Sequence, residues 1–265
     1  MKQKLRDALA AFHRYNGNIN FAAKVTGFDP ETLYDALVVA PTWDVPRVIR
    51  DDSFCVTPLH LSPNDSEWLV ERDGVCLAWI TPHMGAGSVL DHLTLCAELR
   101  YKTLLFVGSA GGLAPGVELG SLYTPEWCVD GVGASRYLRD QLSDYVPFGR
   151  IAPPDAAFVE RVIASAAEGG YTIGKAPVFC TDSFSFEYLH LPEIKATGAK
   201  LIEMETAAFY AFADLMEVPA AALLVVSDNS AVGVSLFAKT DEEKARYYYT
   251  RERVIPELLL RAARS

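Results

Sequence analysis

Two acidic segments stand where apolar runs of the sequence end, and both suggest chemistry on a polar small molecule. Glu203-Met204-Glu205 closes the run that begins at residue 199, and Ser227-Asp228-Asn229 follows the apolar run 220–226. A carboxylate at the end of an apolar strand is costly to desolvate unless donors pair with it, and vicinal sugar hydroxyls are such donors. An acid at the mouth of a buried strand can have a raised pKa and protonate a leaving group. The simpler alternatives are an acid in the first turn of a helix for Glu205 and a plain Ser-Asp-Asn turn for Asp228.

Two glycine-rich segments follow other apolar runs and could approach an anion or a sugar with their backbone amides. Gly108-Ser109-Ala110-Gly111-Gly112 comes after the run 103–107, and residues 83–88, with Gly85 and Gly87, come after the run 75–80. Glycines allow close backbone approach, and the start of a helix favours phosphate or ribose oxygens. Each segment alone is equally well explained as a tight turn or a plain strand-to-helix connection.

The elements that must position these residues alternate between strands and helices. Continuous apolar strands of this kind are typical of a sheet buried on both faces. We therefore predict an α/β fold in three layers, with a mostly parallel central sheet and helices on both faces. Because ligands of such sheets bind beyond the carboxyl ends of the strands, the four segments should meet at one edge. The expected strands are 36–40, 75–80, 103–107, 176–180, 199–204 and 220–226, and the expected helices are 89–99, 152–168, 205–216 and 241–262.

The first 36 residues read as a short helical extension, followed by a catalytic domain over residues 37–265. Residues 3–14 carry apolar positions at helical spacing, and Asp29-Pro30-Glu31 has the cap and first-turn proline that open a second helix. Residues 16–37 also resemble a small helix-turn-helix. The acidic residues at 29–36 argue against DNA binding, because a recognition helix needs basic side chains. A role in packing or in oligomer formation is the more natural expectation.

Composition narrows the class of protein. The chain has 265 residues, half of them hydrophobic, and a net charge of −10, which argues against a broad nucleic-acid or anionic-membrane surface. Its five cysteines lie far apart with no C-x-x-C pair, which favours reduced thiols over a disulfide framework or a metal site. The N-terminus has no apolar stretch of signal-peptide length, and no apolar run in the sequence has the length of a membrane span. We therefore expect a cytoplasmic globular protein without a bound metal.

Taken together, these segments resemble the nucleoside phosphorylase family, which includes purine nucleoside phosphorylases, uridine phosphorylases and methylthioadenosine/adenosylhomocysteine nucleosidases. The resemblance extends over roughly residues 37–262. It is strongest in VGSAGGLAPGVELGSLY (107–123), VFCTDSF (178–184) and LIEMETAAFYAFADLMEVPAAALLVVSDNS (201–230). The last stretch is the most specific, because it joins an E-M-E triplet that opens a helix to a strand that ends in Ser-Asp.

The resemblance implies a role for each matching residue around a nucleoside. Glu205 would accept hydrogen bonds from the ribose hydroxyls, with Met204 packed against the sugar. Asp228 would hydrogen-bond or protonate a purine at N7 as the base departs, and Phe184 would stack on the base. A purine-type base is favoured because Ser227-Asp228 matches the purine-cleaving members.

For the nucleophile, the resemblance points to the glycine-rich segments. Ser109 and the amides around Gly108 would contact phosphate, and Gly85 and Gly87 would line the same cavity. Phosphorylases of the family usually carry an arginine where this chain has Phe106. Their first glycine loop is also degenerate here, since only Asp44 and Arg47 of its pattern remain. Arg47 is then the candidate to hold phosphate, and Asp44 the candidate to activate water.

Three functions follow from these observations. The first is phosphorolysis of a purine-type nucleoside to the free base and ribose 1-phosphate, a pentosyl transfer with phosphate as co-substrate and no other cofactor. The second is hydrolysis of the same bond by water, as in the nucleosidases. The third is a non-catalytic nucleoside-binding protein that kept the fold and lost the phosphate site. By resemblance to the family, a homo-oligomer is expected in each case.

Overall fold

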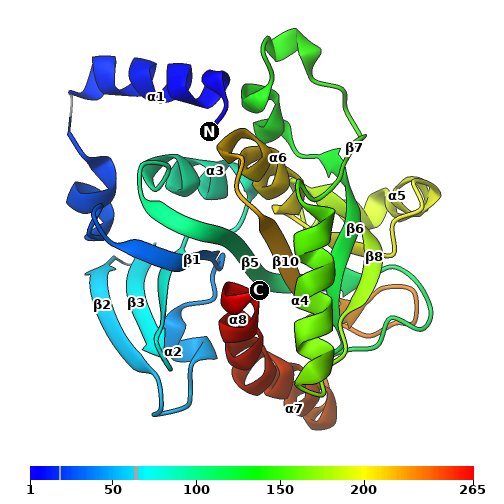
Figure 1. The fold of residues 1–265 in the computed structure, drawn as a ribbon. Coiled ribbons are helices and arrows are strands. Elements are labelled where there is room, and N and C mark those ends of the chain that lie inside the picture. The colour runs from blue at the N-terminus through cyan, green and yellow to red at the C-terminus, as the bar shows by residue number, and fades with distance from the viewer. Residues whose placement is uncertain (18, 63–64) are drawn as a thin grey trace.

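The computed structural model describes residues 1–17, 19–62 and 65–265, which form a mixed α/β fold (Figure 1). Its strands are β1 (Leu33–Val39), β2 (Cys55–Leu61), β3 (Ser66–Arg72), β4 (Val75–Thr81), β5 (Arg100–Gly112), β6 (Leu122–Gly131), β7 (Gly149–Ile151), β8 (Gly174–Thr181), β9 (Leu201–Glu203) and β10 (Ala220–Asn229). The α-helices are α1 (Gln3–Asn16), α2 (Val45–Val48), α3 (Ala86–Leu95), α4 (Ala156–Glu168), α5 (Leu191–Ala196), α6 (Thr206–Met216), α7 (Asp241–Tyr249) and α8 (Ile255–Arg264). Shorter helical turns are η1 (Ala22–Thr26), η2 (Gly133–Leu138), η3 (Leu142–Asp144), η4 (Glu187–Leu189) and η5 (Thr250–Val254).

The strands form one sheet in the order β10-β6-β8-β9-β5-β1-β4-β3-β2, and the short strand β7 pairs with β6. β10 also pairs with β5, so the strands β5, β10, β6, β8 and β9 close on themselves. Within the described residues, five strand pairs are parallel and five are antiparallel. The sheet is therefore mixed, and the prediction of a mostly parallel sheet is corrected. The parallel pairs that join β1, β4, β5 and β10 form its centre.

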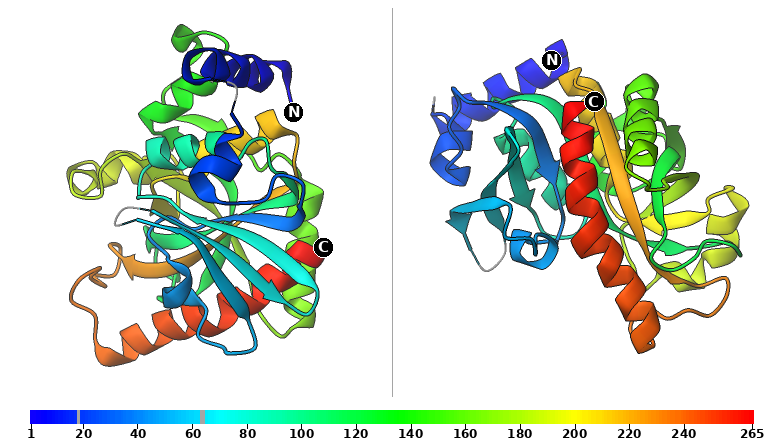
Figure 2. Two further views of the ribbon diagram at one scale, coloured as in Figure 1. Left: turned by 90° about the vertical axis from the view of Figure 1, so that its left-hand side faces the viewer. Right: turned by 60° about the horizontal axis from the view of Figure 1, so that its bottom comes forward.

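Alternate side chains of the central strands enter two separate hydrophobic cores. On β5, Leu104 and Phe106 belong to a core that includes α3 and α6, whereas Leu105 and Val107 belong to a core that includes α4 and α8. β1 and β10 alternate in the same way. Helices cover both faces of these strands, and the sequence of the strands is therefore continuously apolar. Figure 2 shows α8 lying along the sheet on the face opposite α3.

The N-terminal region departs from the prediction at its second helix. α1 packs Leu5 and Leu9 into the core shared with α6, but residues 29–36 do not form a helix. Asp29 accepts hydrogen bonds from the Glu31 amide at 3.0 Å and from the Thr32 hydroxyl at 2.8 Å, which fixes a turn before β1. An Asp-Pro-Glu sequence suits a turn as well as a helix cap, because the carboxylate satisfies nearby donors in both. The division into an extension and a catalytic domain stays a prediction.

The glycine-rich segment 108–112 is part of β5 and does not form the expected loop. β10 runs parallel to it with Asp228 opposite Gly111 and Asn229 opposite Gly112, after a bulge at Ser227. A Cβ on Gly112 would lie 2.6 Å from the Asn229 side chain, and one on Gly111 would lie 3.1 Å from an oxygen of Asp228. Glycines here therefore make room for polar side chains of the neighbouring strand. The hairpin β2–β3 and the strands β6 and β7 were not anticipated.

Gly112→Ala is expected to destabilise the fold by about 1–3 kcal/mol, because the added methyl group meets a side chain that cannot move away. Asn229 is held by its own hydrogen bonds, donating to the carbonyls of Ala114 at 2.9 Å and Val117 at 2.8 Å. Urea unfolding followed by circular dichroism measures the change. The matched control is Gly87→Ala in α3, where nothing lies within 4 Å of the new Cβ. That variant should be neutral or more stable by up to about 1 kcal/mol, and equal losses in both variants would contradict the steric argument.

A buried acid in β3 lies apart from the central strands. Glu67 is 2% exposed, and its Oε2 has no hydrogen-bond partner among the described residues. Burial, with a further contribution from Asp65, raises the pKa of Glu67 to about 8. Asp65 itself lies 3.5 Å from Nε2 of His92 and 3.8 Å from Nε2 of His60. The folded protein therefore holds a proton on Glu67 over a pH range in which the unfolded chain releases it.

Stability is expected to fall as the pH rises from about 5 to 8, because only the folded state keeps this proton. An acid whose pKa is higher when folded stabilises the fold below its ordinary value, and that contribution is lost between the two pKa values. The loss amounts to at most about 5 kcal/mol for a shift of this size. In Glu67→Gln the neutral amide removes this loss, so the difference in melting temperature between pH 5 and pH 8 should shrink. Calorimetry at both pH values tests this, and an unchanged pH dependence in the variant would contradict it.

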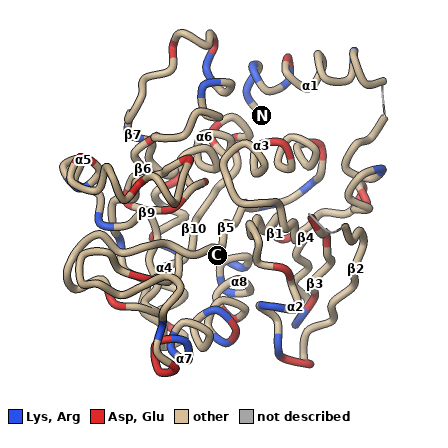
Figure 3. Tube along the Cα trace, turned by 180° about the vertical axis from the view of Figure 1, so that it is seen from behind, with Lys and Arg blue, Asp and Glu red and all other residues tan. Residues whose placement is uncertain are grey.

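No helix among the described residues combines the length and apolar character needed to cross a lipid bilayer. Charged residues are interspersed along the chain in Figure 3, and α7 carries both signs, with Asp241, Glu242 and Glu243 ahead of Lys244 and Arg246. The acids of α7 stand in its first turn, where they complement the helix dipole, and Thr240 and Glu243 form a capping box.

Candidate active site

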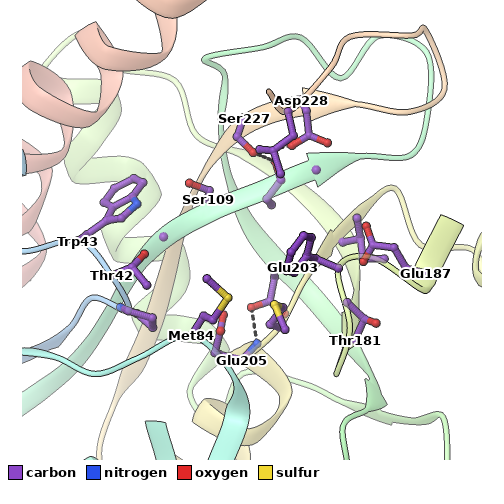
Figure 4. A pocket seen from close by; sticks show the side chains of 18 of the residues that line it. Thr42, Trp43, Met84, Ser109, Thr181, Glu187, Glu203, Glu205, Ser227 and Asp228 are labelled. Atoms are coloured by element: carbon purple, nitrogen blue, oxygen red, sulfur yellow. Dashed lines mark hydrogen bonds between the residues drawn. The ribbon is translucent and has the colours of Figure 1, made fainter. Parts of the chain in front are cut away.

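A cavity of about 310 Å³ opens where β5, β9 and β10 come together near the start of α6 (Figure 4). Four carboxylates line it, those of Glu187, Glu203, Glu205 and Asp228. Its apolar wall includes Trp43, Met84, Phe106, Phe184, Tyr188, Ile202, Met204, Leu236 and Phe237. The cavity lies within the size range of small-molecule sites and combines an apolar lining with a few convergent polar groups.

Glu205 stands at the N-cap of α6 and is only 7% exposed. One of its carboxylate oxygens accepts a hydrogen bond from the backbone amide of Gly85 at 2.5 Å. Burial raises the pKa of Glu205 to about 8, and the neighbouring charge of Glu203 adds to this effect. A ligand that donates hydrogen bonds to this carboxylate would therefore favour its ionised form, which burial disfavours.

Glu203 is the fixed support of this segment. Its carboxylate accepts hydrogen bonds from the amides of Glu205 and Thr206 at 2.8 Å, from the Thr206 hydroxyl at 2.8 Å and from the Cys180 thiol at 2.7 Å. Burial raises the pKa of Glu203 despite these bonds. Because its hydrogen-bonding capacity is used within the protein, Glu203 holds the backbone of Glu205 in place, and Glu205 is the carboxylate left for a ligand.

Asp228 enters the same cavity from the end of β10. The bulge at Ser227 turns the strand here, and the Ser227 hydroxyl donates a hydrogen bond to Asp228 at 2.6 Å. Burial raises the pKa of Asp228, while the Ser227 hydrogen bond and the charge of Lys239 lower it by less. The carboxyl is thus placed to hold a proton at a higher pH than an exposed aspartate does. In Figure 4 Asp228 and Glu205 extend into the cavity from different elements.

Ser109 lies on β5 and lines the same cavity as these two acids. Its hydroxyl is 2.6 Å from the phenol oxygen of Tyr247 in α7, and burial raises the pKa of Tyr247. Thr42 and Trp43 also line the cavity. The φ of Thr42 is 60°, a left-handed conformation that glycine adopts more readily. None of the described residues that line the cavity is a lysine or an arginine.

The geometry agrees with a comparison of the sequence with known families. Residues 67–253 match the family model described as the phosphorylase superfamily. The chain belongs to the phosphorylase superfamily. The resemblance of the sequence to the nucleoside phosphorylase family is therefore confirmed.

The individual proteins that this member of the phosphorylase superfamily resembles have low sequence identity to it. DeoD-type purine nucleoside phosphorylases of Streptococcus pyogenes serotypes M5 and M4 are each 29% identical to it over 155 residues. A DeoD-type purine nucleoside phosphorylase of Streptococcus uberis is 28% identical over the same length. These matches cover 55% of this chain and 62% of each relative. The chain thus matches about three fifths of the length of these curated relatives.

Several residues predicted for the site of this superfamily member line the cavity, and others do not. Phe184, Met204, Gly108 and Ser109 line it together with Glu205 and Asp228. Gly85 lies behind Glu205 as a hydrogen-bond donor, with a φ of 102°, and does not line the cavity. Gly87 belongs to the first turn of α3 and is likewise absent from the cavity wall.

The two polar residues predicted from the degenerate first loop, Asp44 and Arg47, also lie outside the cavity wall. Asp44 caps α2 and accepts hydrogen bonds from the Ser66 hydroxyl at 2.7 Å and from the Trp68 indole at 2.8 Å. Arg47 is exposed, and its guanidinium reaches the carbonyl of Thr42 at 3.5 Å. The cap on α2 sets this direction, because the helix starts at Val45 and turns Arg47 outward. The structure thus places both residues outside this cavity wall, and their roles toward phosphate and water stay predictions.

Sequence reasoning missed Glu187, Trp43 and Tyr247. Glu187 stands in the turn η4 after the Phe184 segment, where the sequence shows no periodic pattern. Tyr247 belongs to a run of three tyrosines at the end of α7, and no local pattern connects it with Ser109. The contact of Tyr247 with Ser109 connects α7 to the site, and Glu187 and Trp43 reach the cavity from segments distant in sequence.

Proposed function

We propose that this protein cleaves the N-glycosidic bond of a purine-type nucleoside and transfers the ribosyl group to phosphate, which yields the free base and ribose 1-phosphate. The observation that carries the proposal is that Glu205 and Asp228, from different strand ends, line one cavity large enough for a nucleoside. The membership of the chain in the phosphorylase superfamily and its similarity to purine nucleoside phosphorylases support the same reaction.

In this mechanism the sugar and the base are held at opposite acids. Glu205 accepts hydrogen bonds from the ribose 2′ and 3′ hydroxyls, and Met204 packs against the sugar. As the C1′–N9 bond breaks, its electron pair moves into the base, and the proton held by Asp228 passes to N7. The sugar gains oxocarbenium character in the transition state, and a phosphate oxygen forms the new bond to C1′. Interactions that strengthen as the bond breaks are the ones that accelerate the reaction.

Hydrolysis is the second candidate, and one observation favours it. A phosphate dianion generally needs cationic or amide-rich contacts, and no lysine or arginine lines the cavity among the described residues. Lys239 and Arg251 stand near Tyr247, with Lys239 Nζ 5.9 Å and the Arg251 guanidinium carbon 5.7 Å from its ring centre. Water needs only neutral partners such as the Ser109 and Tyr247 hydroxyls, whose oxygens lie 2.6 Å apart.

A single assay separates these functions. The protein is incubated with adenosine, inosine and guanosine, with and without phosphate, and the free base and the sugar product are measured. Phosphorolysis predicts base release only with phosphate, together with ribose 1-phosphate. Release of base and free ribose without phosphate would replace it with hydrolysis. Binding of a nucleoside with no turnover under either condition would contradict both.

A further inference from the structure

The mechanism above leaves one carboxylate of the cavity without a role, that of Glu187. It stands in the turn η4 and lines the cavity beside the proposed stacking residue Phe184. In Figure 4 Glu187 and Asp228 lie on one side of the cavity, and Glu205 lies across from them. The charge of Asp228 acts on Glu187, so the two acids are electrostatic neighbours at the end proposed for the base.

Glu187 differs from the other three carboxylates in its bonding. The carboxylates of Asp228 and Glu205 each accept a hydrogen bond from the protein, and that of Glu203 accepts four. In the described part of the chain, no donor forms a hydrogen bond with the Glu187 side chain. Burial and the charge of Asp228 raise its pKa to about 7. A partly buried carboxylate without donors is costly, and a ligand that brings a donor relieves that cost.

In the proposed mechanism Asp228 holds the proton that passes to N7, whereas Glu187, with a pKa of about 7, is largely ionised at pH 8. Such a pair offers one hydrogen-bond donor and one acceptor to whatever lies against it. Adenine presents an N7 acceptor and a 6-amino donor on one edge, whereas guanine presents two acceptors there, N7 and O6, and a 6-oxopurine such as hypoxanthine shares that pattern. A pair of acids with one proton matches the donor and acceptor of adenine. Against a 6-oxopurine the same pair leaves one acceptor of the base without a donor.

We propose that Glu187 accepts a hydrogen bond from the exocyclic amino group of the base while Asp228 donates to N7, so that the site selects 6-aminopurines over 6-oxopurines. This inference rests on the proposed function and adds the class of base to it. Protonation of both acids at lower pH supplies two donors and reduces the selection. The groups facing the pair are Ser227, Tyr188 and Lys239, with Glu243 of α7 beside Lys239.

The test is the affinity for the free bases adenine and hypoxanthine, measured by calorimetry at pH 6, 7 and 8. The wild-type protein is expected to bind adenine about 10- to 100-fold more tightly than hypoxanthine at pH 8, with a smaller ratio at pH 6. In Glu187→Gln the amide offers both a donor and an acceptor, so the ratio should fall below about threefold and lose its pH dependence. An equal ratio in the wild type and this variant, or binding of neither base, would overturn the inference.

A matched control and a second assay isolate the result. Glu193→Gln removes the same charge from a nearby side chain that is 81% exposed, and it should leave the ratio unchanged. Melting temperatures show whether either variant is misfolded. Nucleoside turnover is measured in parallel with adenosine and inosine. Turnover without a change of preference in Glu187→Gln contradicts this inference alone, whereas selective adenine binding without turnover contradicts only the proposed reaction.

Discussion

Asp228→Asn is expected to lower kcat/KM for cleavage of an ordinary purine nucleoside by about 10²- to 10⁴-fold, the range typical of a lost general acid. The asparagine amide can still donate a hydrogen bond to N7, but it cannot transfer a proton to the departing base. Most of the loss should therefore fall on kcat. Steady-state kinetics with the wild type and the variant measure it.

A nucleoside methylated at N7 provides the control for this role. Its base already carries a positive charge and leaves without protonation, so Asp228→Asn should cleave it nearly as fast as the wild type does. A second control is Asp214→Asn, an exposed position on α6 paired with Lys2, which should leave activity unchanged. Equal losses on the ordinary and the methylated substrate would show that Asp228 acts in binding or folding instead of proton transfer.

The same role fixes the direction of the pH dependence. Burial raises the pKa of Asp228, and a general acid works only while it is protonated. The rate for an ordinary nucleoside should fall as the pH rises through that raised pKa, while the rate for the methylated nucleoside should not follow this fall. The charge of Lys239 lowers the pKa of Asp228, and Glu187 interacts electrostatically with Asp228. The pH at which the rate falls therefore depends on all three side chains.

The parts of the fold that could be predicted are those whose pattern is local. β1, β5 and β10 read as continuous apolar runs because alternate residues enter two cores, and α6 and α8 follow helical spacing. The strand β6 could not be read in this way, since Pro125 and Glu126 interrupt its pattern at an irregularity in the pairing with β8. The closure of the strands through the pairing of β10 with β5 is a long-range contact that no local pattern encodes.

The same distinction holds for the candidate site. Glu205 and Asp228 end strands that the sequence marks clearly, and the structure brings both to one cavity. The remaining pattern of the first loop predicts Arg47 as the cation for phosphate, whereas the structure places Arg47 in the short helix α2, outside the cavity wall. The sequence around Glu187 does not predict a site residue, because the role proposed for Glu187 depends on its proximity to Asp228, 41 positions later in the chain. Residues in short turns acquire their roles from neighbours in space.

Glu205→Gln is expected to lower kcat/KM for a ribonucleoside by about 10- to 100-fold, because hydrogen bonds to a charged group contribute about 1.5–3 kcal/mol. The glutamine keeps the size of the side chain and one acceptor oxygen, but it loses the charge that binds two hydroxyl donors. Steady-state kinetics with adenosine or inosine measure the loss. Glu160→Gln, at an exposed ion pair with Lys175, is the matched control and should have no effect.

Kinetics with the 2′-deoxynucleoside test whether Glu205 contacts the 2′ hydroxyl of the sugar. If Glu205 binds the 2′ hydroxyl, the wild type should prefer the ribonucleoside, and Glu205→Gln should lose much of that preference because one partner of the contact is already changed. The coupling between the two changes is then the contribution of this contact, as in a double-mutant cycle. Burial and the charge of Glu203 raise the pKa of Glu205 to about 8. Hydroxyl donors of a bound ribose should lower this pKa, so ribonucleoside binding should release protons at pH 7. Independent effects of the substitution and the missing hydroxyl would place the sugar away from Glu205, and the carboxylate would then need another ligand to explain its burial in the cavity wall.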